Sequence, residues 1–389
     1  MQKKLALIVG AALAMGLGGA ASASAASNVL LDYDGTGGFY SSQTITNLLM
    51  SGGNSLATTN IQTLLPTCSF TTGLCSGAAF NTYFQANIAN ASLSGTGVVA
   101  VNNVSTFNGE TNQDSLTAVV GFQEKLANVF FDSGKNTVTL TFAAVAGGNN
   151  FFQIYANTDP ANDLTGVCFV CGTRVMAGSV STTTGFTSNF TINNVTTLAS
   201  NGGTCPAGQV SSNGFCFGTD TLDQAGTDFY NGAKTVLGGG TVDLRANVAS
   251  YNTTYFNGLS GNIISLAFAN SVGTSIPYNQ VQPSACFLNG SIALGASPYL
   301  YPNATCGTTN PNYNNLTGVG PFIGTGSAVG PTAGTVNGFG TNTVFQTTGI
   351  ISFDSVPSAV PEPATLTLLG VGLLGTAAAR RRAKKAQKK

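Results

Sequence analysis

The chain has 389 residues, and its 14 basic residues balance its 14 acidic ones, so the formal net charge is zero. Only 7% of the residues are charged, against roughly 25% in an average soluble domain, and the chain contains no histidine. The absence of histidine excludes a Ser-His-Asp or Cys-His catalytic site, a histidine-ligated zinc ion and imidazole acid/base catalysis.

The neutral total hides an uneven distribution of charge along the chain. Two of the basic residues are Lys3 and Lys4, and seven more lie within residues 380–389. Residues 28–360 therefore contain five basic and 13 acidic residues, a net charge of −8. A body with this charge repels phosphate backbones, so we expect no nucleic-acid partner.

Residues 1–26 have the three-part layout of a secretory signal peptide. A short positive segment with Lys3 and Lys4 precedes an apolar run, residues 5–17, and small residues follow as far as Ala26. The apolar run is shorter than the ~20 residues that a membrane-spanning helix needs. We therefore expect a cleaved signal peptide and a body that begins at about residue 27.

One stretch predicts a helix. Phe80, Phe84, Ile88 and Ala91 recur at helical spacing in a segment without glycine or proline. We expect at most one or two short helices in the whole body.

Several stretches alternate apolar and polar residues, which is the pattern of strands with one buried face. Clusters of glycine, asparagine and serine separate them, as turns require. These stretches are residues 116–122, 137–142, 241–248, 264–268 and 351–353. The sequence therefore predicts an all-β body over residues 27–356, an antiparallel β-sandwich or barrel-like fold with long Gly/Asn/Thr-rich loops. Within it, residues 307–349 are expected to be loop-like.

The chain contains eight cysteines, an even number that suits disulfides in an exported protein. Pairing of sequence neighbours would join Cys68 with Cys75, Cys168 with Cys171, Cys205 with Cys216, and Cys286 with Cys306. A bridge between Cys168 and Cys171 closes a very tight ring, so pairing of these two with the region of Cys205 and Cys216 stays open. A redox couple or half of a zinc site at Cys168 and Cys171 are further alternatives.

Acidic residues give only a weak indication of a metal site, and we expect no cofactor. Asp32 and Asp34 begin a segment similar to a calcium loop, but Gln43 stands where an EF-hand needs a bidentate glutamate. Other closely spaced acids that could gather Ca²⁺ are Asp159 with Asp163, and Asp220 with Asp223 and Asp228. Solvated acids in turns are the simpler interpretation.

Residues 357–389 contain a three-part C-terminal segment. Pro361, Glu362 and Pro363 precede an apolar run, residues 364–379, which as a helix would cover about 24 Å at 1.5 Å per residue. A basic tail, residues 380–389, follows and includes Arg380, Arg381, Arg382, Lys384 and Lys385. By the positive-inside rule the tail stays in the cytoplasm, so the hydrophobic helix would hold the body outside the inner membrane.

This segment resembles the PEP-CTERM sorting signal of bacterial surface proteins. The resemblance implies that an exosortase, a membrane-embedded peptidase, reads Pro361, Glu362 and Pro363 as substrate residues and processes the protein on its way to the surface. It also implies a membrane anchor that is only transient. The body has a weaker resemblance to the flocculation-associated subgroup of PEP-CTERM proteins.

The sequence as a whole favours a non-enzymatic protein of the cell surface or extracellular matrix. Exopolysaccharide in a biofilm or floc is the expected ligand, and exposed tyrosine rings would offer platforms for sugars. The tyrosines concerned are Tyr33, Tyr40, Tyr299, Tyr301 and Tyr313. The alternative is a secreted protein that binds or degrades polysaccharide with a pair of aspartates.

Overall fold

The structure is a computed structural model that describes residues 29–32, 44–93, 97–101, 115–147, 150–157, 169, 173–221, 234–259, 263–272, 336–339 and 342–353. Contacts within the chain divide it into two units, and every described residue lies in the unit Ser27–Asp354. The remaining unit consists of Met1–Ala26 and Ser355–Lys389.

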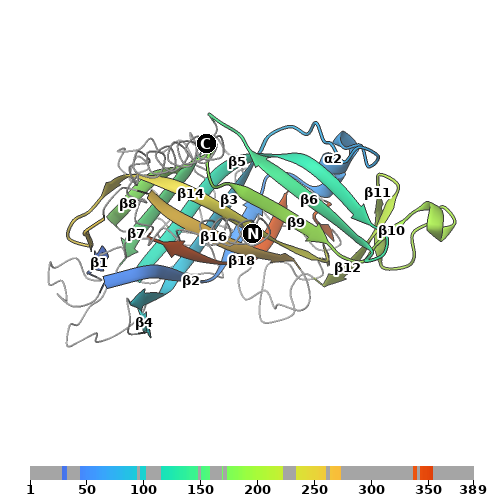
Figure 1. The fold of residues 1–389 in the computed structure, drawn as a ribbon. Coiled ribbons are helices and arrows are strands. Elements are labelled where there is room, and N and C mark those ends of the chain that lie inside the picture. The colour runs from blue at the N-terminus through green and yellow to red at the C-terminus, as the bar shows by residue number, and fades with distance from the viewer. Residues whose placement is uncertain are drawn as a thin grey trace, which may run out of the picture. The chain divides into compact units, whose positions relative to one another are not determined.

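Eight of the described strands form a closed ring of antiparallel neighbours (Figure 1). In order around the ring they are β2 (Thr44–Ala57), β18 (Thr343–Ser352), β16 (Ile263–Val272), β14 (Gly238–Tyr251), β8 (Thr173–Val180), β7 (Phe151–Asn157), β5 (Ser115–Asp132) and β3 (Phe80–Leu93). The pairing of β3 with β2 closes the sheet. The all-β, barrel-like prediction is therefore confirmed.

One part of the ring wall is divided between two pairs of strands. Residues 115–121 of β5 pair with β7, whereas residues 124–132 pair with β6 (Thr137–Ala144). Likewise β14 pairs with β9 (Thr187–Ile192) near its start and with β8 near its end. Since β6 pairs with β9 and β7 with β8, each pair completes the wall at a different end of the long strands.

A smaller sheet packs at the end of the ring where β6 and β9 lie (Figure 1). It consists of β10 (Val195–Thr197), β11 (Gln209–Ser212), β12 (Phe215–Thr221), β13 (Lys234–Val236) and β17 (Val336–Asn337). The pairing of β13 with β17 is parallel, and the other pairings in this sheet are antiparallel. Val195, Phe217 and Val236 of this sheet belong to the same buried cluster as Leu140 of β6.

The described interior contains two apolar clusters that follow this division of the wall. Phe122 of β5 belongs to the cluster on the side of β7 and β8. Leu126 belongs to the cluster on the side of β6 and β9. Both side chains are buried on the inner face of one strand, and Glu124 lies between them.

Short elements complete the described fold. They are β1 (Val29–Leu31), β4 (Gly97–Ala100), β15 (Phe256–Asn257), helix α2 (Ile61–Leu64), and the 3₁₀ helices η1 (Leu65–Thr67) and η2 (Ala199–Asn201). Helix α2 is a single turn. The Asn60 side chain caps its N-terminus by accepting a hydrogen bond from the Thr63 amide. The prediction of few and short helices is confirmed for the described residues.

The predicted helix over residues 80–91 is wrong, because this segment is strand β3. A spacing of four residues returns a side chain to one face of a helix, but it does so on a strand as well. Thr82 and Ala86, which lie between the predicted contacts, are also buried, so the inner face follows a period of two. Pairing with β2 and β5, distant in sequence, decides the conformation.

The expectation that residues 307–349 are loop-like is wrong for the end of that segment. β17 lies within it, and β18 begins at Thr343. The polar composition of β18 conceals a buried strand: Thr347 is buried, and its hydroxyl lies 2.6 Å from the Ser55 hydroxyl on β2. A hydrogen bond between strands thus makes a polar residue acceptable in the ring wall.

Candidate functional site

The predicted sorting residues lie outside the described part of the chain. These are Pro361, Glu362, Pro363, the helix over residues 364–379, and Arg380, Arg381, Arg382, Lys384 and Lys385. The predicted signal peptide, residues 1–26, lies outside it too. Among the residues that the structure does describe, no helix is long and apolar enough to cross a membrane.

Two of the expected disulfides are present. Cys68 is bonded to Cys75, and Cys205 to Cys216. Both pairs are the sequence neighbours that the spacing indicated. The other four cysteines, Cys168, Cys171, Cys286 and Cys306, lie outside the described residues.

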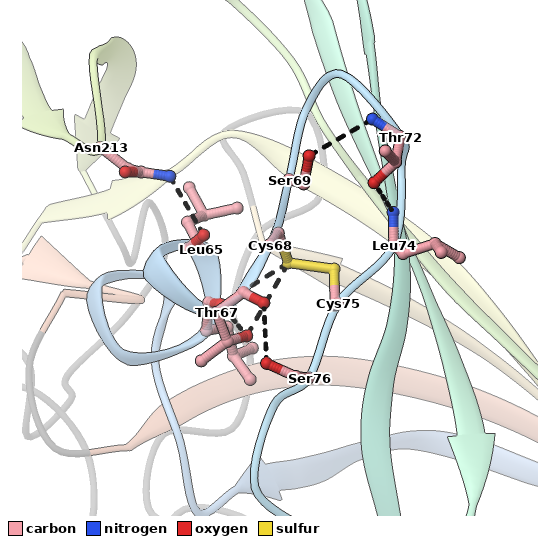
Figure 2. The surroundings of a disulfide bond; sticks show 10 residues. Leu65, Thr67, Cys68, Ser69, Thr72, Leu74, Cys75, Ser76 and Asn213 are labelled. Atoms are coloured by element: carbon pink, nitrogen blue, oxygen red, sulfur yellow. Dashed lines mark hydrogen bonds between the residues drawn. A yellow bond between two sulfur atoms is a disulfide. The ribbon is translucent and has the colours of Figure 1, made fainter.

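The bridge between Cys68 and Cys75 closes a loop that lies against strand β5 (Figure 2). The Cys75 amide donates a hydrogen bond to the Ala127 carbonyl, and the Val129 amide donates to the Gly73 carbonyl. Within the loop, the Ser69 hydroxyl accepts a hydrogen bond from the Thr72 amide. The loop therefore extends the sheet beside the irregular pairing that β5 makes with β6 between Leu126 and Asn128.

The two described disulfides lie in segments that contact each other. The ring centroids of Phe70 and Phe215 are 4.5 Å apart, and Phe215 precedes Cys216 on β12. The Asn213 side chain also donates a hydrogen bond of 3.0 Å to the Leu65 carbonyl, as Figure 2 shows. Both bridges thus stabilise the end of the ring where the smaller sheet packs.

The predicted calcium and tyrosine sites cannot be assembled from the described residues. Asp32 and Asp220 are described, but their neighbours Asp34, Asp159, Asp163, Asp223 and Asp228 lie outside the described ranges. The same holds for Tyr33, Tyr40, Tyr299, Tyr301 and Tyr313. Within the described ranges, no three His, Cys, Asp or Glu residues gather as metal ligands would.

A cavity of about 60 Å³ lies inside the ring on the side of β6 and β9. Its walls are mostly apolar and include Ile61, Leu64, Leu140, Phe190, Val236 and Val242. Glu124 also lines it and is 4% exposed. It is the one charged side chain among the described lining residues.

The Glu124 carboxyl is incompletely hydrogen-bonded. The Thr82 hydroxyl donates a hydrogen bond of 2.6 Å to Oε1. Burial raises the pKa of Glu124 to about 7, and the hydroxyls of Thr82 and Ser188 oppose this rise only in part. Ser188 lies near the carboxyl, yet Oε2 makes no hydrogen bond of ordinary length and angle within the described chain. Among the described residues, buried side-chain atoms of Gln85, Arg174, Gln209 and Gln346 share this lack of a hydrogen-bond partner.

Glu124 is not among the site residues expected from the sequence, although the sequence contains a signal for it. The apolar alternation that predicts strand β5 places Leu116, Ala118, Val120 and Phe122 on the buried face. Continuing that alternation by one step places Glu124 on the same face. A glutamate in an apolar face is unusual unless it has a partner or a function.

A second feature is a polar face on the outer side of β6, β9 and β14, which we name the Thr/Asn face. Its residues are Thr139 and Thr141 on β6, Thr187, Asn189 and Thr191 on β9, and Thr241 on β14. They alternate with buried residues such as Leu140, Phe190 and Val242, so they point away from the core.

Hydrogen bonds across neighbouring strands order the Thr/Asn face. The hydroxyls of Thr139 and Thr191 are 3.1 Å apart. The Asn189 amide donates a hydrogen bond of 3.0 Å to the Thr241 hydroxyl. These pairs hold hydroxyl and amide groups in an ordered array across the three strands.

Comparisons with curated proteins and with solved structures find no match to the chain. The family model of the PEP-CTERM protein-sorting motif matches residues 359–382. The match covers Pro361, Glu362 and Pro363, the apolar run and the first arginines, as the sequence predicted. The chain therefore carries a PEP-CTERM protein-sorting motif, the mark of exported proteins that an exosortase processes at the membrane for delivery to the cell surface.

Proposed function

We propose that this protein is a non-enzymatic component of the cell surface or extracellular matrix, and that its Thr/Asn face binds exopolysaccharide in a biofilm or floc. The PEP-CTERM motif supplies the route to the surface. The observation that carries the binding proposal is the ordered array of hydroxyl and amide groups on β6, β9 and β14, beside which the Asp243 carboxylate accepts a hydrogen bond from Thr187.

The chemistry of the Thr/Asn face suits a polymer of sugars. Threonine hydroxyls and the asparagine amide both donate and accept hydrogen bonds, as sugar hydroxyls do. A strand spacing of about 4.8 Å and a repeat of about 6.8 Å along each strand give the face a regular grid. A repeating polymer can contact many points of such a grid at once, so weak individual hydrogen bonds add up.

A purified variant with two substitutions on the face tests this proposal. Thr141→Glu and Thr241→Glu place bulky charges at two exposed positions on either side of Asn189. Retention of the protein by exopolysaccharide isolated from the host should fall to about one fifth or less, since each lost hydrogen bond is worth about 1 kcal/mol. Gln62→Glu, at an exposed position on α2, is the matched control and should bind normally. Unchanged retention of the double variant would refute a role of this face.

The described lining of the cavity contains a single carboxyl group, that of Glu124, which is the second reason why we propose a non-enzymatic role. Glycoside hydrolysis ordinarily uses two carboxyl groups about 5–10 Å apart. In the described lining of the cavity, Glu124 has no second carboxylate beside it. Incubation of the protein with host exopolysaccharide should release no new reducing ends, and their release at a rate abolished by Glu124→Gln would instead establish an enzyme.

A further inference from the structure

The starting observation is a depression on the outer side of the ring wall, which we name the outer depression. It has a volume of about 370 Å³, at the low end of the roughly 300–1,000 Å³ range of small-molecule sites. Asp243 and Arg245 of β14 line it, and both residues are exposed. A ligand in solvent can therefore reach both charged side chains.

The sizes of side chains on neighbouring strands explain the outer depression. Asp243 lies opposite Ala267 of β16, and Arg245 lies opposite Ser265. Ser265 in turn lies opposite Ser352 of β18. Opposite side chains on one face of a sheet stand about 4.5–5.5 Å apart, so long side chains on β14 beside small ones on β16 leave a hollow. The charged groups of β14 lie at its edge.

Contacts with the segment before β9 and with β9 itself position the two charged side chains. A Cβ atom at Gly185 would lie 2.9 Å from Cγ and 3.1 Å from Nε of Arg245, so the absence of a side chain at Gly185 leaves room for the arginine. The Ser181 amide ties this segment to β14 by donating a hydrogen bond of 2.7 Å to the Arg245 carbonyl. The Thr187 hydroxyl donates a hydrogen bond of 3.2 Å to Oδ2 of Asp243.

The two charges restrict the class of ligand. Arg245 forms no ion pair with an acidic side chain of the described chain, so its guanidinium can donate hydrogen bonds to a ligand. The Asp243 carboxylate can only accept them. An anionic ligand would be repelled by Asp243, and a cationic ligand by Arg245. An uncharged ligand with groups that both donate and accept suits both side chains, and the adjacent hydroxyls of a sugar are such groups.

We infer that the outer depression binds one uncharged sugar unit of the exopolysaccharide, an inference that rests on the proposed function. Hydroxyls of the sugar donate to Asp243 and accept from Arg245, and hydrogen bonds of this charge-assisted type are about twice as strong as neutral ones. Thr187 belongs to both the Thr/Asn face and the outer depression, so the polymer site continues from β9 across β14 toward β16.

Short oligosaccharides prepared by partial hydrolysis of the host exopolysaccharide test the inference, after anion exchange has separated the neutral fraction from the acidic one. In calorimetric titrations of the purified protein, the neutral fraction should bind. Its affinity should change less than about twofold between roughly 0.05 and 0.5 M sodium chloride, because no net charge is neutralised on binding. Binding of the acidic fraction alone, or an affinity that falls steeply with salt, would overturn the inference.

Two variants locate the site. Asp243→Asn keeps the size of the side chain but removes the charge, and Ala267→Phe fills the floor of the outer depression. Each should lower the affinity for the neutral fraction about tenfold or more. Asn247→Ser, at an exposed position of β14 that does not line the outer depression, is the matched control and should bind as wild type does. Equal affinities of wild type and Asp243→Asn would refute the site, and the salt series on the unaltered protein decides where a variant folds poorly.

This inference and the proposed function fail in different ways. If whole exopolysaccharide retains the wild type while Asp243→Asn binds the neutral fraction normally, the outer depression is not the sugar site and the proposed function stands. If exopolysaccharide does not retain the wild type and neither fraction binds, both are wrong. If the neutral fraction binds while Thr141→Glu/Thr241→Glu is retained normally, the Thr/Asn face is refuted and the outer depression stands.

Discussion

The ring of Phe70 lies 4.5 Å from the ring of Phe215, centroid to centroid. One ring belongs to the loop closed by Cys68 and Cys75, and the other to the strand that carries Cys216. The contact makes two short covalent loops into one packed unit at the end of the closed sheet. Loops that could otherwise move apart are thereby tied to each other as well as to β5 and β12.

Removing either described disulfide should destabilise the protein. The bridges close loops with sequence separations of 7 and 11 residues, for which loop-closure entropy gives about 2–3 kcal/mol each. Urea denaturation of the Cys68→Ser/Cys75→Ser and Cys205→Ser/Cys216→Ser variants measures this loss. Because Phe70 contacts Phe215, we expect the losses to couple by about 0.5 kcal/mol or more when both bridges are removed. If the two losses of unfolding free energy were strictly additive, the contact between Phe70 and Phe215 would not couple the two disulfides.

Glu124 should make stability depend on pH. Its pKa is raised from an ordinary 4.5 to about 7 in the folded protein, so the folded state holds the proton more tightly than the unfolded state. The contribution of Glu124 to the free energy of unfolding is fully present below about pH 4.5. It is lost as the pH rises through 7, and the total loss is about 3 kcal/mol. The free energy of unfolding, measured at pH 5 and pH 8, should therefore fall with pH.

Glu124→Gln should remove this part of the pH dependence, because glutamine does not titrate. The variant should gain stability relative to wild type at pH 8 and lose that advantage at pH 5. Parallel pH profiles for wild type and Glu124→Gln would contradict the burial of an ionisable carboxyl.

Gly240 should tolerate no side chain, because β9 lies very close to it. A Cβ atom at this position of β14 would overlap the carbonyl oxygen of Asn189 and lie 2.8 Å from the Phe190 Cα atom. Both contacts are backbone atoms, which cannot rotate away. Gly240→Ala should therefore cost about 1–3 kcal/mol or more in thermal or urea unfolding. Gly134→Ala, in an exposed turn where the nearest contact is a flexible Asp132 oxygen at 3.3 Å, should cost little by comparison.

The strands that the sequence reveals most clearly are those with one buried and one exposed face. β6 and β14 alternate regularly because the outer side of each meets solvent. β3 lacks that alternation, since most of its residues are buried, and its four-residue spacing resembles a helix. β18 is concealed for a different reason, because buried threonines replace apolar residues there: the Thr347 hydroxyl bonds the Ser55 hydroxyl of β2, and the Thr343 hydroxyl donates to the Thr59 carbonyl.

Ring closure and the cavity depend on pairings between distant segments. Ser55 of β2 meets Thr347 of β18 across 292 residues, and no local pattern encodes that contact. The disulfides were predictable, because Cys68 and Cys75, like Cys205 and Cys216, are close in sequence. The place of Glu124 on an inner face could be read from its strand, but Thr82 and Ser188 come from other strands and complete the site only in three dimensions.

Substitutions in different parts of the sorting motif should affect peptidase recognition and membrane insertion separately. Leu369 lies in the apolar run, and a charged residue at the centre of a membrane helix costs about 2.5–3.5 kcal/mol on insertion scales. Leu369→Arg should therefore release precursor from the membrane fraction. Leu369→Ile, which preserves the apolar run, is the control and should leave retention unchanged.

Glu362→Gln should have the opposite phenotype, because it alters the Pro-Glu-Pro element and leaves the apolar run and the basic tail intact. Insertion depends on those two parts, so the variant should still enter the membrane. Cleavage by an exosortase that reads the motif should fail, and unprocessed protein should accumulate there. Immunoblots of membrane and extracellular fractions, with intact mass to locate the cleavage, distinguish the outcomes. Maturation of Glu362→Gln at the wild-type rate would mean that the peptidase does not read this carboxylate.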